Sequence, residues 1–232
     1  MKKLAAIILL LMFSLLSFGQ RGITWISAGI KAGYGGSMLY NSSAFTDNAL
    51  QYKYYTPAYS YGGRVGFSFN EGAFGIYLEG LSNTWGQDYV VNNNENHSVK
   101  LSSMSFGLIM KAMSLGGVYF EFGPQYNVIN RLEMDGLVVQ TNNVSQYSSL
   151  VAGLGYMPVF GNRLEVGLGL RAMVSLGTIM NDFNFFSASP NSTSYANYNT
   201  MGVILVPMLE VNYVFAYMGR ASCGKFRIML NK

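Results

Sequence analysis

Alternation of residue types with a period of two is the feature of this chain that most limits its fold. From Arg163 to Val174, apolar residues at the even positions alternate with glycine, charged residues and one methionine at the odd positions. A period of two places successive side chains on opposite faces of a β-strand. The segment therefore predicts a strand with one apolar face and one face of small and charged residues.

Eight segments of this kind predict eight strands. They lie at 23–35, 58–70, 73–85, 99–112, 117–128, 147–158, 163–179 and 200–217. The connections between them alternate in length, with short turns near 70–72, 113–116 and 159–162 and long polar segments at 36–57, 86–98, 129–146 and 180–199. This order is typical of an all-β, eight-stranded antiparallel up-and-down transmembrane barrel with both termini on the same side of the membrane.

Nine of the ten charged residues in these strands share the face opposite the large apolar residues. The nine are Lys31, Arg64, Glu79, Lys111, Glu121, Arg163, Glu165, Arg171 and Glu210. The tenth, Lys100, falls on the same face as the large apolar residues, but it lies near a strand end, where its amine can reach the membrane surface. A basic side chain facing lipid at the midplane costs about 2–4 kcal/mol, so we assign the apolar face to lipid. An eight-stranded barrel is narrow enough to be filled by its own side chains. The nine residues thus predict a structural ion-pair network rather than an open pore.

Composition separates this interpretation from a soluble barrel. Charged residues make up 11% of the chain and hydrophobic residues 50%, whereas ordinary soluble domains are about 25% charged. A soluble, lipocalin-like barrel would have the opposite arrangement, with apolar side chains inside and charged side chains outside. It would crowd many Phe and Leu side chains into a narrow interior and expose a face of Gly and Ser, so the membrane barrel is favoured.

The N-terminus has the pattern of a secretory signal. Lys2 and Lys3 precede an apolar run from 4 to 13, and a small residue at 17 and at 19 predicts cleavage before Gln20. An uncleaved membrane anchor is the alternative. The predicted organisation is a signal peptide at 1–19, a barrel at 20–217 and a periplasmic tail at 218–232. Without Lys2 and Lys3 the formal charge falls from +4 to +2 (4 − 2), which removes the main support for a nucleic-acid partner. Cys223 is the only cysteine, so an intramolecular disulfide is excluded.

Two further features concern the strand ends and the last strand. Aromatic residues near strand ends predict two interface girdles, with ordinary packing as the alternative. They are Trp25, Tyr59, Trp85, Tyr126, Tyr147, Tyr213 and Phe215. Pro207 lies within 200–217 and cannot donate to a ladder, so it predicts a bulge or a shorter strand.

Catalytic chemistry has little support in the sequence. His97 is the only histidine and lies beside Ser98, but adjacent residues of a strand point to opposite faces and no orienting acid is evident. One His and one distant Cys do not make a usual metal ligand set. We therefore expect no enzyme activity, no cofactor and no metal.

The mature chain from about Gly22 to Phe215 resembles the PorT-like family of outer-membrane β-barrels of Gram-negative bacteria. The resemblance rests on Val118-Tyr119-Phe120-Glu121-Phe122-Gly123-Pro124 and on Leu150-Val151-Ala152-Gly153-Leu154-Gly155-Tyr156 followed by the strand from Arg163. It implies an outer-membrane location and, for one branch, support of a secretion system. Many such barrels end in an aromatic residue on the last strand. This chain differs at its C-terminus, because a tail follows Tyr213-Val214-Phe215.

The resulting functional expectation is a non-enzymatic barrel in the outer membrane, with both termini in the periplasm. Its expected partners are outer-membrane lipid and proteins that contact the long loops or the periplasmic face. A small, porin-like diffusion channel is the alternative, and it requires a water path through the interior.

Overall fold

The computed structural model describes most of the chain beyond the predicted signal. The described residues are 24–41, 50–53, 55–69, 72–91, 95–138, 146–159, 163–177, 179, 200–220 and 226–230. The predicted signal peptide and Cys223 lie outside these ranges. Within them, no helix is long and apolar enough to cross a bilayer.

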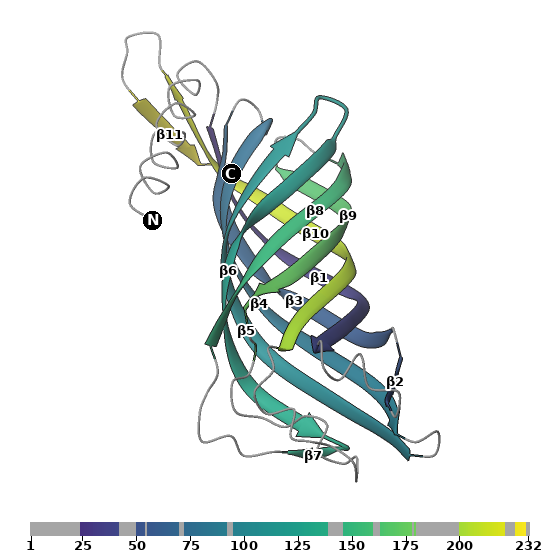
Figure 1. Cartoon of the computed structure of the whole chain (residues 1–232). Coiled ribbons are helices and arrows are strands. Elements are labelled where there is room, and N and C mark those ends of the chain that lie inside the picture. Colours follow the sequence, from purple (N-terminus) through teal and green to yellow (C-terminus); the bar gives the residue numbers. More distant parts are fainter. Residues whose placement is uncertain are drawn as a thin grey trace, which may run out of the picture.

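Eight long antiparallel strands form a closed ring, shown in Figure 1. Neighbours in the sequence pair with each other, and the first strand pairs with the last, which closes the barrel. This confirms the predicted fold class. The strands are β1 (Thr24–Asn41), β3 (Thr56–Phe69), β4 (Phe74–Val91), β5 (Glu95–Met113), β6 (Val118–Met134), β8 (Gln146–Val159), β9 (Leu164–Leu176) and β10 (Thr200–Arg220).

The two faces of each strand differ as the alternation predicts. Leu78 and Phe106 point outward and are 62% and 55% exposed. Their neighbours in the sequence, Glu79 and Ser105, point inward and are buried. The interior is closely packed: a Cβ atom added to Gly123 would lie 2.0 Å from the Leu108 carbonyl oxygen. Glycine is therefore required where the curved wall brings neighbouring backbones together inside.

Three short strands extend the wall at its two ends (Figure 1). At the end that carries the long connections, β2 (Leu50–Tyr52) pairs with β4 and β7 (Leu137–Val138) pairs with β6. We call this the loop end. At the opposite end, the turn end, β11 (Phe226–Leu230) pairs with Ala216–Arg220 of β10. β11 thus lies within the segment predicted as a tail.

Strands at the loop end are longer than predicted. The β4–β5 ladder is continuous from Phe74↔Ala112 to Val91↔Glu95, so the prediction of a long polar loop at 86–98 was wrong. β1 and β6 likewise continue to Asn41 and Met134. The extensions of β4, β5 and β6 carry polar residues such as Asp88, Asn96 and Arg131 on the outer face. The contrast between an apolar and a polar face, which marks the rest of each strand, is therefore lost there.

Pro207 neither shortens β10 nor introduces a bulge. The pairs Gly33↔Met208 and Gly36↔Leu205 keep the same register, and only the two positions between them lack partners in β1. The β9–β10 ladder continues through Pro207↔Leu170. The missing N–H therefore interrupts the ladder on the β1 side alone. The bulge in this seam lies instead between Ile26 and Ser27.

The predicted aromatic girdles are only partly on the outer surface. Tyr59, Tyr126, Tyr213 and Phe215 are exposed, in keeping with an interface position. Trp25, Trp85 and Tyr147 instead point inward and are buried, and Trp85 packs edge-on against Tyr147 at 5.8 Å. For these three residues the alternative of ordinary packing holds.

Candidate functional site

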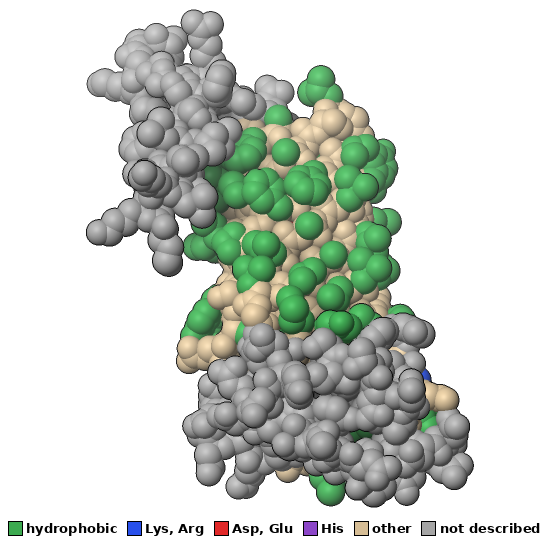
Figure 2. Space-filling view, in the orientation of Figure 1, with side chains coloured by type: hydrophobic (Ala, Val, Ile, Leu, Met, Phe, Trp, Pro, Cys, Tyr) green, Lys and Arg blue, Asp and Glu red, His purple; other side chains and the backbone are tan. Residues whose placement is uncertain are grey.

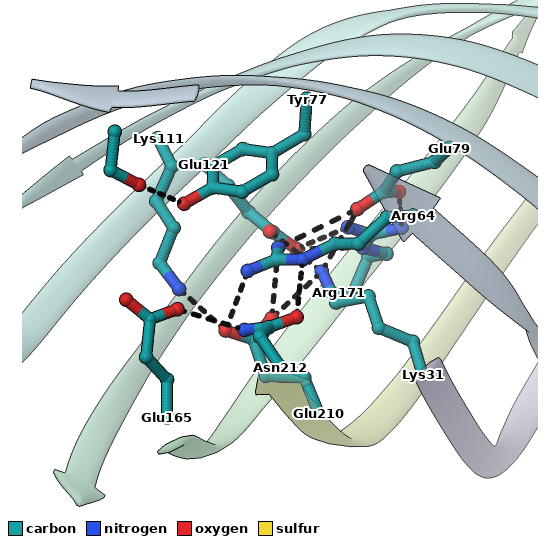
Figure 3. A network of polar contacts seen from close by, with 11 residues as sticks. Lys31, Arg64, Tyr77, Glu79, Lys111, Glu121, Glu165, Arg171, Glu210 and Asn212 are labelled. Atoms are coloured by element: carbon teal, nitrogen blue, oxygen red, sulfur yellow. Dashed lines mark hydrogen bonds and ion pairs between the residues drawn. The ribbon is translucent and has the colours of Figure 1, made fainter. Parts of the chain in front are cut away.

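The barrel interior brings together eight of the nine charged residues selected from the sequence. Seven of the eight long strands contribute, and each of the eight side chains is at least 96% buried. Figure 3 shows them directed toward one another within the ring. We call this set the interior network. It consists of Lys31, Arg64, Glu79, Lys111, Glu121, Glu165, Arg171 and Glu210.

Lys31 of β1 is the hub of the interior network. Its Nζ lies 3.2 Å from Glu79 Oε1, 2.8 Å from Glu121 Oε2 and 3.1 Å from Glu210 Oε2. These carboxylates come from β4, β6 and β10, on different sides of the ring. One ammonium group, with three N–H donors, therefore ties together four strands.

Arg171 of β9 holds two of the same carboxylates. Its Nε donates to Glu121 Oε1 at 2.7 Å, and its two terminal nitrogens donate to both oxygens of Glu79 at 2.7 and 3.1 Å. The planar guanidinium suits such forked contacts, which are stronger than bonds between neutral groups. Arg171 and Lys31 thus share Glu79 and Glu121 between them.

Arg64 of β3 joins this centre to β10. Its Nε donates to Asn212 Oδ1 at 2.9 Å, and its terminal nitrogens lie 3.1 Å from each oxygen of Glu210. Its guanidinium also lies 4.0 Å from the centre of the Tyr77 ring, a cation–π contact.

Lys111 and Glu165 form the side of the interior network nearest the turn end. Lys111 Nζ donates to Glu210 Oε1 and lies 4.0 Å from the centre of the Tyr119 ring. Glu165 accepts a hydrogen bond from Asn212 Nδ2 at 3.1 Å. Asn212 therefore bridges Glu165 to Arg64.

The formal charges of the interior network cancel. Its four basic and four acidic side chains sum to zero, since Lys31, Arg64, Lys111 and Arg171 oppose four glutamates. A buried charge without a partner carries a large desolvation cost. Neutrality and shared contacts keep all eight in a space that excludes solvent.

Arg163 does not belong to this group. It is exposed and directly precedes the first residue of β9, where its carbonyl accepts a hydrogen bond from the Val214 N–H. The prediction extended the alternation of β9 by one residue into the preceding turn, so its placement of Arg163 on the inward face was wrong. A turn residue is not bound by the two-residue period of the strand.

Three neutral residues of the site were not selected from the sequence, although the period of two points to them. Tyr77 and Tyr119 each lie two residues before a network glutamate, and Asn212 lies two residues after Glu210. Each therefore shares the inward face of its strand with that charge.

A second polar layer runs from strand to strand along the inner face of the wall, between the interior network and the loop end. Ser60 Oγ donates to Asn83 Oδ1, Asn83 Nδ2 to Ser105 Oγ, Ser105 Oγ to Asn127 Oδ1, and Asn127 Nδ2 to Ser149 Oγ. All five side chains are buried. This chain of hydrogen bonds crosses five consecutive strands and satisfies polar groups that would otherwise be buried without partners.

Apolar side chains fill the interior on both sides of these polar layers. Toward the loop end the buried cluster includes Trp85, Leu101, Tyr147, Ile179 and Ile204. Between the charges and the turn end, Trp25, Met157 and Val214 are buried. The interior network is thus enclosed along the barrel axis by side chains that offer little to water.

At the loop end, His97 has the acidic partner that the sequence did not reveal. His97 Nδ1 lies 2.8 Å from Asp135 Oδ2, and the Ser98 N–H donates to Asp135 Oδ1 at 2.8 Å. The His97 ring also stacks on Tyr89 at 5.4 Å. An orienting acid is therefore present. The bond from the Ser98 backbone makes the contact a clasp between β5 and the turn after β6.

This clasp predicts a pH dependence at the loop end. Partial burial would raise the pKa of Asp135, but the hydrogen bonds from His97 and Ser98 outweigh it, so the pKa lies below the ordinary 3.8. A lowered pKa means that the clasp is fully formed above about pH 4 and is lost as pH falls through the folded value. Hydrogen exchange of the Ser98 amide should therefore show a constant protection factor down to about pH 4 and a decline below it. Asp135→Asn should remove the decline; an unchanged profile in that variant would contradict the clasp.

Among the residues that the structure describes, no group of three or more His, Cys, Asp and Glu side chains is placed to hold a metal ion. The four network glutamates are instead engaged with basic side chains or with Asn212.

Comparison with known proteins gives only remote similarities. No protein-family profile and no curated protein matches the chain. Among solved structures, Neisserial surface protein A is 13% identical with a TM-score of 0.43 and covers 84% of this chain and 100% of its own. OprG, an outer membrane protein from Pseudomonas aeruginosa, is 12% identical with a TM-score of 0.42, covering 83% and 95%. Ail, the attachment invasion locus protein of Yersinia pestis, is 13% identical with a TM-score of 0.38, covering 84% and 99%.

Proposed function

We propose that this chain is a non-enzymatic integral protein of the outer membrane of a Gram-negative bacterium, with a filled interior. Its role in this proposal is structural or partner-binding. The observation that carries the proposal is a closed barrel with an apolar outer wall and a neutral set of buried charges inside. Only closed barrels and helices satisfy all backbone hydrogen bonds in hydrocarbon.

The outer wall supports the membrane location. Ile30, Leu78 and Leu154 are 68%, 62% and 61% exposed, and such a concentration of exposed apolar residues is unfavourable in water. On the face in Figure 2, hydrophobic side chains are spread over the wall between the two grey regions, with backbone and uncharged side chains between them, and a basic side chain is visible only at its lower rim. A band of this kind matches hydrocarbon.

The ends of the barrel support the orientation. Short turns join the strands at the turn end, where β1 begins and β10 ends, and the long connections lie at the other end. Barrels of the outer membrane place short turns in the periplasm and long loops outside. Both termini are therefore periplasmic in this proposal.

A partner-binding role is supported by the loop end. There β4, β5 and β6 extend the wall, with β2 and β7 added at the sides. The outer face of this extension carries polar and charged residues, including Asp88, Lys100 and Arg131. Such a surface suits contact with hydrated partners. The resemblance to PorT-like barrels makes support of secretion or envelope assembly the corresponding cellular role.

We expect the barrel to be closed to ions. After reconstitution into planar bilayers, the protein should give no discrete conductance steps, because two polar layers and the apolar clusters beside them fill the interior. A porin added afterwards to the same bilayer serves as the positive control. Reproducible openings from the purified protein would favour the diffusion channel instead.

The barrel itself is tested by its mobility in gels. The folded protein extracted in detergent should migrate differently before and after boiling, because a closed barrel resists unfolding by detergent. A soluble β protein with unchanged mobility would contradict the membrane location.

A further inference from the structure

Side-chain hydroxyl groups gather on one part of the outer wall, near its loop end. In β1, β3, β4 and β5, which are neighbours in the ring (Figure 1), the outward positions change from apolar to hydroxyl-bearing residues toward the loop end. On β4, for example, Ile76 and Leu78 are followed on the same face by Ser82 and Thr84. We call this group the hydroxyl patch. It consists of Tyr34, Tyr59, Tyr61, Ser82, Thr84 and Ser102.

The strand register makes the hydroxyl patch continuous. Tyr59 lies opposite Tyr34 in the β1–β3 ladder and opposite Thr84 in the β3–β4 ladder. Thr84 in turn lies opposite Ser102 in the β4–β5 ladder. Side chains directly opposite each other on one face of a sheet are close enough to interact. The hydroxyl patch is therefore one surface that crosses four strands.

The aromatic rings of the hydroxyl patch are open to the outside. Tyr34, Tyr59 and Tyr61 are exposed. The Tyr34 and Tyr59 rings are tilted by 49° with their centres 5.3 Å apart, and Tyr34 also shares a hydrogen bond with Tyr55. Tyr61 lies opposite Ser82 of β4. The hydroxyl patch thus presents aromatic rings and aliphatic hydroxyls side by side.

The hydroxyl groups of the patch are mostly not engaged by the protein. Of the six side chains, only that of Tyr34 forms a hydrogen bond with a residue that the structure describes. A hydroxyl group that meets hydrocarbon without a hydrogen-bond partner costs free energy. In the proposed membrane, the hydroxyl patch therefore needs hydrogen-bonding groups from the molecule that covers it.

Other parts of the wall near the loop end differ from the hydroxyl patch. On β9 and β10 the outward residues there are aliphatic, with Leu176 and Met201 exposed. On β6 and β8 an exposed tyrosine is present, but the Tyr126 hydroxyl donates to Gln146. Hydroxyl groups that lack a partner among the described residues are thus concentrated on one side of the barrel, whereas an interface girdle would surround it.

The hydroxyl patch carries no charge, which identifies the chemistry that it suits. Outside the interior, the charged side chains described next to it are Lys53, Asp88 and Lys100, which are of both signs and lie nearer the loop end. Phosphate and carboxylate groups are recognised chiefly by Arg and Lys, so an anionic headgroup is poorly matched. Sugar hydroxyls both donate and accept hydrogen bonds, as the hydroxyls of Tyr, Ser and Thr do. The C–H groups of a sugar ring also pack against the face of an aromatic ring.

We propose that the hydroxyl patch binds the sugar headgroup of a glycolipid in the leaflet next to the loop end. This inference rests on the proposed membrane location, and in the proposed orientation that leaflet faces the outside of the cell. The hydroxyl patch continues the apolar wall, since Val65 and Leu78 lie on the same outer face of β3 and β4. A glycolipid covers both surfaces, with its acyl chains on the apolar residues and its sugar on the hydroxyls. A free sugar would leave the apolar residues uncovered.

Native mass spectrometry of the full-length protein, in a detergent without a sugar group, measures which lipids remain bound. The probes are glucosyl-dioleoylglycerol and dioleoyl-phosphatidylglycerol, which have the same acyl chains and differ in the headgroup. We expect the glucosyl lipid to bind about tenfold more tightly, because several neutral hydrogen bonds form only with the sugar. Methyl glucoside, which has the same sugar without acyl chains, should not displace the lipid at an equal concentration.

Two matched triple variants separate the hydroxyl patch from tyrosines elsewhere on the wall. The first removes three hydroxyl groups of the patch and keeps the rings, so it should bind the two lipids equally well. It combines Tyr34→Phe, Tyr59→Phe and Tyr61→Phe. The second removes the hydroxyls of three exposed tyrosines outside the patch and should keep the preference for the glucosyl lipid. It combines Tyr126→Phe, Tyr156→Phe and Tyr213→Phe.

The outcomes that overturn the inference are distinct from failure of the barrel. Equal binding of the two lipids by the native protein, with heat-modifiable mobility retained, overturns sugar recognition and leaves the proposed function standing. Displacement by methyl glucoside at an equal concentration assigns the patch to a free sugar, and a dimer lost only in the first variant assigns it to a second copy of the chain. Either result overturns the glycolipid. A protein without a heat-modifiable band overturns both proposals.

Discussion

Replacing Arg171 with methionine is expected to lower the free energy of unfolding by about 3–5 kcal/mol. Arg171 is 1% exposed and donates to both Glu79 and Glu121. Methionine has a similar length but no charge, so two carboxylates lose a basic partner without gaining access to water. Denaturant titration in detergent micelles, followed by the fluorescence of buried Trp25 and Trp85, measures the change.

The matched control for this experiment lies in the turn directly before the same strand. Arg163→Met removes an exposed guanidinium at the residue before β9, and surface substitutions of this kind change stability by about 0.5 kcal/mol or less. Equal losses in the two variants would contradict an interior network that depends on Arg171.

Placing arginine at Leu78 tests which face of the wall meets lipid. Leu78 is 62% exposed on β4, between Val65 and Leu108. In the proposed membrane, Leu78→Arg should reduce the free energy of unfolding in lipid vesicles by about 2–4 kcal/mol, the cost of a basic side chain near the midplane. In water the same exposed substitution would have little effect.

Leu137→Arg provides the comparison at the loop end. Leu137 is 75% exposed on β7, beyond the apolar band, so its replacement should change the unfolding free energy by about 0.5 kcal/mol or less. If Leu78→Arg were as mild as Leu137→Arg in vesicles, the apolar wall would not be in contact with hydrocarbon.

The ring of eight strands could be predicted from the sequence because each strand repeats the same local rule. A slip of one residue would move every side chain of a strand to the other face, so a charge such as Glu79 beside Leu78 identifies both faces at once. The same rule gave wrong results where it ceases to apply. Arg163 lies in a turn, and the outer ends of β4 and β5 carry polar residues, so neither shows the contrast between faces.

Contacts within the site could not be predicted in the same way. Lys31 and Glu121 are separated by 90 residues, and Lys31 and Glu79 by 48. Their meeting depends on the register of several ladders, and register is set by turns and bulges such as that at Ile26–Ser27. The clasp between His97 and Asp135 has the same origin, since the β5–β6 ladder brings together residues 38 positions apart.

Pairing of the first strand with the last sets the order of events during assembly. Arg64 and Glu79 meet as soon as the β3–β4 hairpin forms, but Lys31 contacts carboxylates on β4, β6 and β10. Before β1 joins β10, several of these charged side chains would face hydrocarbon without an oppositely charged partner. The resulting free-energy cost is removed only when charged residues of distant strands pair with them. Insertion of single hairpins into the bilayer is therefore disfavoured, and we expect insertion to be coupled to ring closure.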